Sequence, residues 1–307
     1  LWSDGGYYLN NGASVCEDHH ILCESTDISV EDVRVACNIT KIILPEHLYY
    51  DQPYDKWGNP ILENGKRSKG ELFFDESVQK ILKQYNKLSL FTNYIKYPRT
   101  YHLPWSENKT DDDRTISNVN HFIGKRVIVS EKMHGENTSL YKDYFHARSI
   151  DSRNHPSRSM AKKLHSQFSY DIPDGWRICV ENLYATHSIH YTDLKSYIYG
   201  FSIWNELNQC LSWDDTMTWF SLLGITPVNV LYDGIFDENK IRSLYDVGDW
   251  KNKEGYVIRL ADTFDYKDFK LSVAKYVRKN HVQTVKHWMH GQPIIPNELI
   301  TIEKSEE

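Results

Sequence analysis

Three short strand-like runs joined by turns constrain the fold of this chain more than any other feature, and they cover residues 125–132, 138–141 and 144–148. In the first run, Val127 and Val129 lie on one face and Lys132 on the other, because side chains alternate between the two faces of a strand. The chain breaks at His134-Gly135 before the second run begins. Together the three runs predict an antiparallel meander.

The pattern that follows adds helices to these strands. The same alternation predicts further strands at residues 176–183, 197–204 and 255–260. Pro156 opens a predicted helix that ends near Phe168. A second predicted helix spans residues 214–223 and ends at Gly224, because glycine favours the conformation that terminates helices. Antiparallel sheets with flanking helices predict the α+β class.

A polar and acidic stretch, residues 107–114 (ENKTDDDR), separates the N-terminal third from this regular pattern. We therefore predict an N-terminal module over residues 1–108 and a second domain over residues 109–307. The pattern does not fix the fold of the module, which we interpret either as an RNA-binding module or as the remnant of an HNH nuclease module.

The N-terminal module contains four possible metal ligands, Cys16, His19, His20 and Cys23. A zinc site normally needs a second pair of ligands, and only Cys37 follows these four. A zinc site and a degenerate structural module therefore both stay open.

Composition limits the class of protein without identifying it. The net charge of -6 does not exclude nucleic-acid binding, because local basic stretches can still bind phosphates. The 5 cysteines are scattered, which implies no disulfide framework and favours a reducing compartment. No apolar run is long enough to cross a bilayer, and no signal peptide opens the sequence. We expect an intracellular protein without membrane contact, located in the cytoplasm or, if it is viral, in the host cytoplasm.

A lysine lies where the first predicted strand meets the glycine turn, in the sequence EKMHGEN at residues 131–137. The strand would hold Lys132 while its amine reaches the cleft that the turn lines. Taken alone, such a lysine is most often a solvated surface residue. A series of charged and aromatic residues at later strands and strand ends changes this interpretation, namely Arg148, Glu181, Tyr199, Phe201, Glu254, Lys275 and Arg278.

This ordered series resembles the motifs of the covalent nucleotidyltransferase superfamily of ligases and capping enzymes. It is most similar to RNA ligases of the RNA ligase 2 class, whose first motif reads Glu-Lys-x-His-Gly-x-Asn, whereas DNA ligases and capping enzymes carry Asp where His134 stands. The resemblance covers residues 97–280 and implies a nucleotidyltransferase (ATP-grasp-like ligase adenylylation) domain. Only 307 − 275 = 32 residues follow Lys275, which is too few for the OB domain of DNA ligases and capping enzymes.

The resemblance implies an ATP-dependent RNA ligase that works with Mg²⁺ or Mn²⁺, forms a covalent lysyl-AMP and joins the 5′-phosphate and 3′-hydroxyl ends of RNA in RNA repair. The implied catalytic residues are Lys132, Glu254 and Lys275. Glu254 is also the implied metal ligand. The implied nucleotide-binding residues are Glu131, Met133, Arg148, Glu181, Phe201, Tyr199, Lys270 and Arg278. The residues implied in RNA end joining are Gly135 and Asn137.

Two points qualify these roles. A lysine with a pKa of ~10.4 is almost fully protonated at neutral pH, so the site is expected to depress the pKa of Lys132 for attack. The last motif of the superfamily usually reads Lys-x-Lys, but Val277 stands at the second position here. Arg278 or Lys270 is the candidate for the second cation.

Two other functions stay open from the sequence: an inactive nucleotidyltransferase fold that binds nucleic acid, and a DNA ligase. Residues 97–106 either line the nucleotide or RNA cleft or form a plain connection. The segment with Lys279, His281, Lys286 and His287 predicts a basic helix that is either solvated or in contact with RNA. No obligate protein partner is evident from the sequence.

Overall fold

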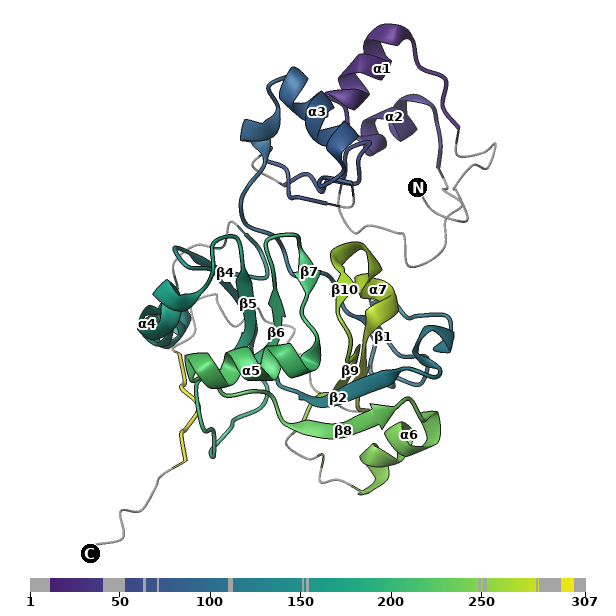
Figure 1. The fold of residues 1–307 in the computed structure, drawn as a ribbon. Coiled ribbons are helices and arrows are strands. Elements are labelled where there is room, and N and C mark those ends of the chain that lie inside the picture. The colour runs from purple at the N-terminus through teal and green to yellow at the C-terminus, as the bar shows by residue number, and fades with distance from the viewer. Residues whose placement is uncertain are drawn as a thin grey trace, which may run out of the picture. The chain divides into compact units, whose positions relative to one another are not determined.

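The computed structural model describes most of the chain (Figure 1). The described residues are 12–40, 53–62, 65–70, 72–109, 113–150, 152, 155–247, 250, 253–279, 281 and 294–300. The chain divides into two compact units, Leu1–Ile95 and Lys96–Glu307. Residues 96–108, which the sequence placed in the N-terminal module, belong to the second unit, where β1 (Tyr101–His102) pairs with β11 (Val273–Val277). A separate function for the N-terminal module stays a prediction.

The described residues of the first unit form three short α-helices, α1 (Glu17–Glu24), α2 (Val30–Ala36) and α3 (Glu76–Gln84). Helix α2 begins with a capping box in which Ser29 and Asp32 satisfy each other's backbone N–H groups. Asp75 caps α3 by accepting hydrogen bonds from the N–H groups of its first turn. The small core comprises Phe73, Val78 and Leu82.

The second unit is built on two sheets. Its five-stranded sheet has the order β1-β11-β9-β2-β8, with β9 (Gly255–Leu260), β2 (Arg126–Lys132) and β8 (Val230–Ile235). Its six-stranded sheet has the order β10-β7-β6-β5-β3-β4, with strands β10 (Phe264–Asp265), β7 (Gln209–Cys210), β6 (Ile198–Trp204), β5 (Arg177–Asn182), β3 (Glu136–Leu140) and β4 (Phe145–Ala147). The paired strands are antiparallel except for β1 and β11. Antiparallel sheets with flanking helices confirm the predicted α+β class.

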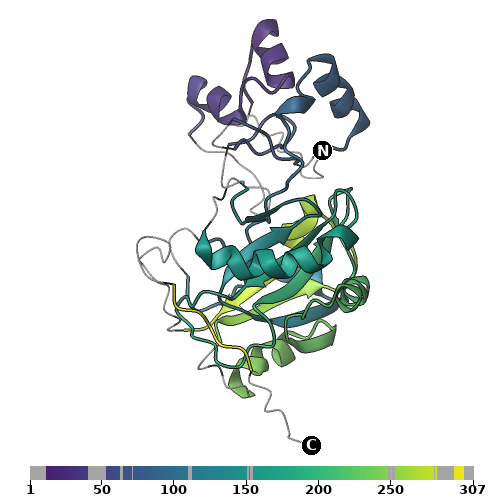
Figure 2. The ribbon, with the colours of Figure 1, turned by 90° about the vertical axis from the view of Figure 1, so that its left-hand side faces the viewer.

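Two helices cover the outer face of the six-stranded sheet, α4 (Ser159–Phe168) and α5 (Trp213–Leu223) (Figures 1 and 2). Phe168 of α4 and Phe220 of α5 share one apolar core with strand residues such as Val180. Burial of this core stabilises the unit by removing apolar surface from water. The remaining helices are α6 (Glu238–Val247) and α7 (Phe269–Ser272).

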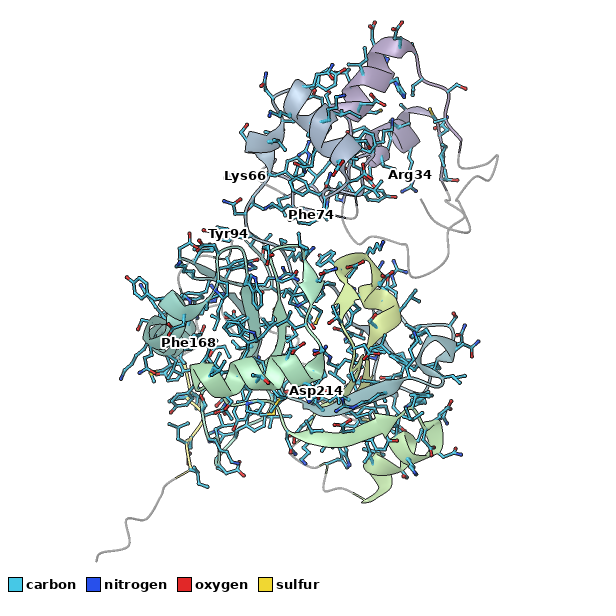
Figure 3. All side chains as sticks on the ribbon, in the orientation of Figure 1. Arg34, Lys66, Phe74, Tyr94, Phe168 and Asp214 are labelled. Carbon is cyan, nitrogen blue, oxygen red and sulfur yellow. The ribbon has the colours of Figure 1, made fainter. Side chains whose placement is uncertain are left out.

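Helix α5 has the boundaries that its sequence predicts. Ser212 caps it by accepting a hydrogen bond from the N–H of Asp215, and Gly224 ends it with a left-handed φ of 67°. Asp214, which is labelled in Figure 3, lies in the first turn of α5. Its Oδ2 atom lies 2.7 Å from Arg126 Nη1 at the start of β2. Across the described part of the chain, no helix is long and apolar enough to span a membrane.

The predicted meander is wrong in one respect, because β2 does not pair with β3. Strand β2 lies in the five-stranded sheet, while β3 and β4 lie in the six-stranded sheet. The chain crosses between the sheets at the turn around Gly135, which packs against the backbone of Asn182. A Cβ atom at Gly135 would lie 2.4 Å from the Asn182 carbonyl oxygen, so only glycine fits this crossing. The crossing places the two sheets on opposite sides of a cavity.

Candidate active site

A cavity lies between the two sheets, and residues of both sheets line it. Strand register explains which side chains reach it from the five-stranded sheet. Ser130 pairs with Val257, which pairs with Lys275, so these three residues share one face of the sheet. Lys132 lies two residues beyond Ser130 on β2 and therefore points to the same side.

Seven of the residues predicted for the site line this cavity: Glu131, Lys132, Met133, Asn137, Glu181, Phe201 and Lys275. They come from both sheets and from segments far apart in the sequence. Two residues of the segment 97–106, Tyr97 and Thr100, line it as well. This segment is therefore part of the cavity wall.

Lys132 and Glu254 form a partly buried ion pair at the cavity. The Lys132 Nζ atom lies 2.9 Å from Glu254 Oε2, and the exposed fractions of the two side chains are 23% and 8%. Burial alone would raise the pKa of Glu254, but Lys132 and His134 hold it down at about 2. Glu254 is therefore a carboxylate at neutral pH.

The expected depression of the Lys132 pKa is wrong for this arrangement of side chains. Burial lowers the pKa of Lys132, but the carboxylates of Glu254 and Glu181 outweigh burial, so the pKa is raised. The amine is therefore protonated at neutral pH.

His134 is a contact of Glu254 that the sequence marked only as part of the motif. Its Nδ1 atom lies 2.9 Å from Glu254 Oε2, and its Nε2 atom lies 2.9 Å from the Ser188 hydroxyl. The backbone N–H of His134 donates a hydrogen bond to the Tyr191 hydroxyl. The imidazole is therefore held on both sides against the carboxylate that pairs with Lys132.

Glu181 enters the cavity from the six-stranded sheet. Its Oε1 atom accepts a 2.9 Å hydrogen bond from the backbone N–H of Gly135. Burial raises the pKa of Glu181 to about 7. Its charge can therefore change near neutral pH, in contrast to that of Glu254.

Lys275 lines the cavity from the same sheet as Lys132. Its ammonium contacts Asp113, an acidic residue that we did not assign to the site from the sequence. Its Nζ atom lies 3.3 Å from Asp113 Oδ1, and Asp113 also lies 3.1 Å from His102 Nε2. Burial lowers the pKa of Lys275, and the positive charge of Lys132 lowers it further. Asp113 belongs to the acidic stretch that we interpreted from the sequence as a domain boundary. Its contact with Lys275 was therefore not predicted.

Of the two aromatic residues predicted for the site, Phe201 and Tyr199, only Phe201 lines the cavity. Phe201 lines the cavity and packs edge-on against Tyr97, with ring centroids 5.3 Å apart. Tyr199 is buried in the adjoining core, where its hydroxyl accepts a hydrogen bond from the backbone N–H of Lys195. Of the two predicted rings, Phe201 is therefore the one that lines the cavity.

Three of the predicted nucleotide-binding cations do not line the cavity. Arg148 is exposed just beyond β4. Lys270 lies 5.1 Å from the centroid of the Tyr101 ring. Arg278 donates a hydrogen bond to the Lys253 carbonyl oxygen at 2.6 Å. The second cation of the last motif is therefore not in place at the cavity in this conformation.

The four possible zinc ligands do not gather around one point. Cys16 Sγ lies 2.9 Å from His19 Nδ1, whereas His20 lies 3.7 Å from Glu24. Among the described residues, the one group of three or more side chains with metal-ligand atoms within 4.8 Å of one another is His134, Glu254 and His281. Zinc binding by the N-terminal module stays a prediction. The predicted basic C-terminal helix falls largely on residues 282–293, outside the described residues.

Several solved structures of nucleic-acid ligases match this chain at low identity and low TM-score. An archaeal ATP-dependent RNA ligase is 17% identical, with a TM-score of 0.41 over 60% of this chain and 48% of that one. A provisionally identified ATP-dependent DNA ligase of Aquifex aeolicus is 19% identical, with a TM-score of 0.41 over 60% and 50% of the two chains. The chain thus spans about half the length of these two proteins.

A Naegleria gruberi RNA ligase with PPi is 17% identical, with a TM-score of 0.43 over 75% of this chain and 76% of that one. Scores this low carry no argument about function. No curated protein matches the sequence. Residues 125–277 match the family model for RNA ligase, and this match spans β2 to β11, which carry Lys132, Glu181 and Lys275. Through this region, the chain belongs to the RNA ligase family.

Proposed function

We propose that this protein is an ATP-dependent RNA ligase that joins a 5′-phosphate end to a 3′-hydroxyl end through a covalent Lys132-AMP. The observation that carries the proposal is the position of Lys132. It lines a cavity between two sheets, 2.9 Å from Glu254 and on the same sheet face as Lys275, within the region that matches the RNA ligase family. We infer a role in repair of RNA breaks inside the cell.

In the first step, the neutral Lys132 amine attacks the α-phosphorus of ATP. A phosphorus–nitrogen bond forms, the bond from the α-phosphorus to the bridging oxygen breaks, and pyrophosphate leaves. The proton of the ammonium must leave before attack. Because Glu254 and Glu181 raise the pKa of Lys132, any bound cation that offsets their charge favours loss of this proton.

Two carboxylates near Lys132 fit a divalent cation. Glu254, which pairs with Lys132, is buried and ionised, and Glu181 lines the cavity from the facing sheet. Such buried carboxylates suit Mg²⁺ or Mn²⁺, with Glu254 as the residue that would hold the ion. The ion would supply positive charge against the phosphates of ATP.

The remaining residues divide between the phosphate and the base. Lys275 would offset the negative charge that develops on the α-phosphate, because its ammonium lies on the same sheet face as Lys132. Phe201 would stack on adenine, since aromatic rings bind the flat face of a base. Glu131, Met133 and Glu181 would complete the nucleotide contacts.

Two further phosphoryl transfers follow. The RNA 5′-phosphate attacks the phosphorus of Lys132-AMP and frees the lysine, and the 3′-hydroxyl then attacks the activated 5′-phosphate and releases AMP. We assign Asn137 to these later steps. It lines the cavity, and its buried Oδ1 atom has no hydrogen-bond partner among the described residues, so it can accept from an RNA hydroxyl. Gly135 acts with it by holding the turn in place.

The proposal is tested by labelling with α-labelled ATP and Mg²⁺, after pyrophosphate treatment has removed any bound AMP. We expect label on the wild type and none on Lys132→Ala. Lys142→Ala is the matched control, because Lys142 is exposed and pairs with Asp174 away from the cavity. Sealing is then compared on nicked RNA and nicked DNA. Label on Lys132→Ala, or sealing of DNA alone, would contradict the proposal.

A further inference from the structure

Three imidazole rings surround the carboxylate of Glu254. The His134 ring lies 4.6 Å from the His281 ring and 5.5 Å from the His187 ring, both measured between centroids and both nearly perpendicular. His134 Nδ1 already contacts Glu254 Oε2 at 2.9 Å. The proposed ligation chemistry uses Glu254 but gives no task to these histidines.

His281 holds a buried nitrogen that has no hydrogen-bond partner among the described residues. Only 4% of the residue is exposed, and its Nε2 atom has no hydrogen-bond partner within the described part of the chain. The backbone of His281 is anchored, because its carbonyl oxygen accepts a 2.6 Å hydrogen bond from the Asn108 side chain. A buried polar atom without a partner costs free energy, so this atom is expected to serve a ligand.

The ligand atoms of His134, Glu254 and His281 all lie within 4.8 Å of one another. Ligands of one transition-metal ion sit about 2.0 to 2.2 Å from it, so two of them lie no more than about 4.4 Å apart. The His134 and Glu254 atoms, at 2.9 Å, are already close enough to share one. The spacing of the three residues is therefore close to that of a metal site.

We propose that His134, Glu254 and His281 form a site that binds a divalent transition-metal ion directly, with Mn²⁺ favoured over Mg²⁺. Imidazole nitrogens bind divalent transition-metal ions, and a carboxylate also suits Mn²⁺, whereas Mg²⁺ takes oxygen ligands and keeps its water. This inference deepens the proposed function in that Glu254 is the shared metal ligand. The metal binding itself needs neither ATP nor reaction of Lys132.

The site also links the metal to the nucleophile. Glu254 Oε2 contacts both Lys132 Nζ and His134 Nδ1, each at 2.9 Å. An ion bound to this carboxylate competes with the Lys132 ammonium for the same charge. Replacing Lys132 by the neutral Met should therefore tighten Mn²⁺ binding, and His281→Gln should weaken it.

The test is pulsed EPR of Mn²⁺ added alone to the full chain freed of AMP, with a parallel EPR titration of affinity. We expect nitrogen hyperfine modulation from bound imidazole in the wild type. In His281→Gln the modulation should shrink and the dissociation constant for Mn²⁺ should rise about tenfold or more. His190→Gln is the matched control, because His190 is exposed and pairs with Glu298 outside this cluster.

Bound Mn²⁺ without nitrogen modulation in the wild type would contradict the proposed metal site, regardless of the result for His281→Gln. Equal affinity in wild type and His281→Gln would do the same. If His281→Gln misfolds by circular dichroism, His134→Gln takes its place in the titration. Nitrogen modulation without label on Lys132 would overturn the ligase proposal alone, and label without modulation would overturn the metal site alone.

Discussion

The two sheets that wall the cavity contribute different chemistry. The five-stranded sheet presents the ammonium groups of Lys132 and Lys275, whereas the six-stranded sheet presents the carboxylate of Glu181, the amide of Asn137 and the ring of Phe201. The cations suit a triphosphate, and the facing groups suit ribose, base and RNA hydroxyls. Neither sheet therefore forms the site alone, and the crossing at Gly135 brings the two sets of side chains together.

The largest effect is expected on the cationic side. Lys275→Ala should slow formation of Lys132-AMP by about 10²- to 10³-fold, because the α-phosphate loses a buried cation that offsets developing charge. Lys275→Arg should recover part of the rate. Single-turnover labelling measures both. A wild-type rate in Lys275→Ala would show that the five-stranded sheet does not provide the phosphate contact.

On the facing sheet, Glu181 should control stability near neutral pH. Its pKa is raised from 4.5 to about 7, so the stabilising contribution is present below pH 4.5 and is lost as pH rises through 7. The free energy of unfolding of the wild type should therefore fall by about 3 kcal/mol over this range relative to Glu181→Gln. Urea unfolding at several pH values measures this difference. Parallel pH profiles for the two proteins would contradict the assignment.

A variant of Asn137, on the six-stranded sheet, should affect the sealing step but not the formation of Lys132-AMP. Asn137→Ala should reduce sealing of RNA that already carries a 5′-linked AMP by about 10- to 100-fold, through loss of a buried hydrogen bond to the RNA. Its rate of Lys132-AMP formation should stay at the wild-type level. Supplying adenylylated RNA isolates the later step. Equal loss in both steps would place Asn137 at the nucleotide instead.

The smallest effect is expected from the aromatic wall. Phe201→Ala should raise the ATP concentration for half-maximal labelling by about tenfold, because a stacked base loses its platform. Phe201→Tyr, which keeps the ring, should stay near the wild type. Tyr199→Phe is the control, since Tyr199 lies in the adjoining core. An effect of Tyr199→Phe as large as that of Phe201→Ala would contradict the assignment of the ring.

The sequence predicted those features that local periodicity determines. The two faces of β2 follow from alternation, and the ends of α5 follow from its cap and Gly224. The order of the motifs predicted that Lys132, Glu181 and Lys275 converge, and all three line one cavity. This prediction did not require the order of the strands in the sheets.

Other features depend on contacts between distant segments, which no local pattern encodes. The change of sheet at Gly135 depends on the backbone of Asn182, and the contact of Asp113 with Lys275 spans two parts of the chain. From the sequence, we interpreted Asp113 as part of a polar domain boundary and His281 as part of a basic helix, and neither was predicted for the site. Arg148 matched a motif position, yet its side chain is exposed beyond β4.

The most direct test of the account is mass spectrometry of the chain after incubation with ATP and Mg²⁺. The account predicts that the peptide containing Lys132 gains the mass of AMP through an acid-labile phosphorus–nitrogen bond, and that pyrophosphate removes it. The same peptide from Glu254→Gln should carry much less of the adduct. An adduct on another residue, or an unmodified Lys132 peptide from a folded protein that binds ATP, would contradict the central claim.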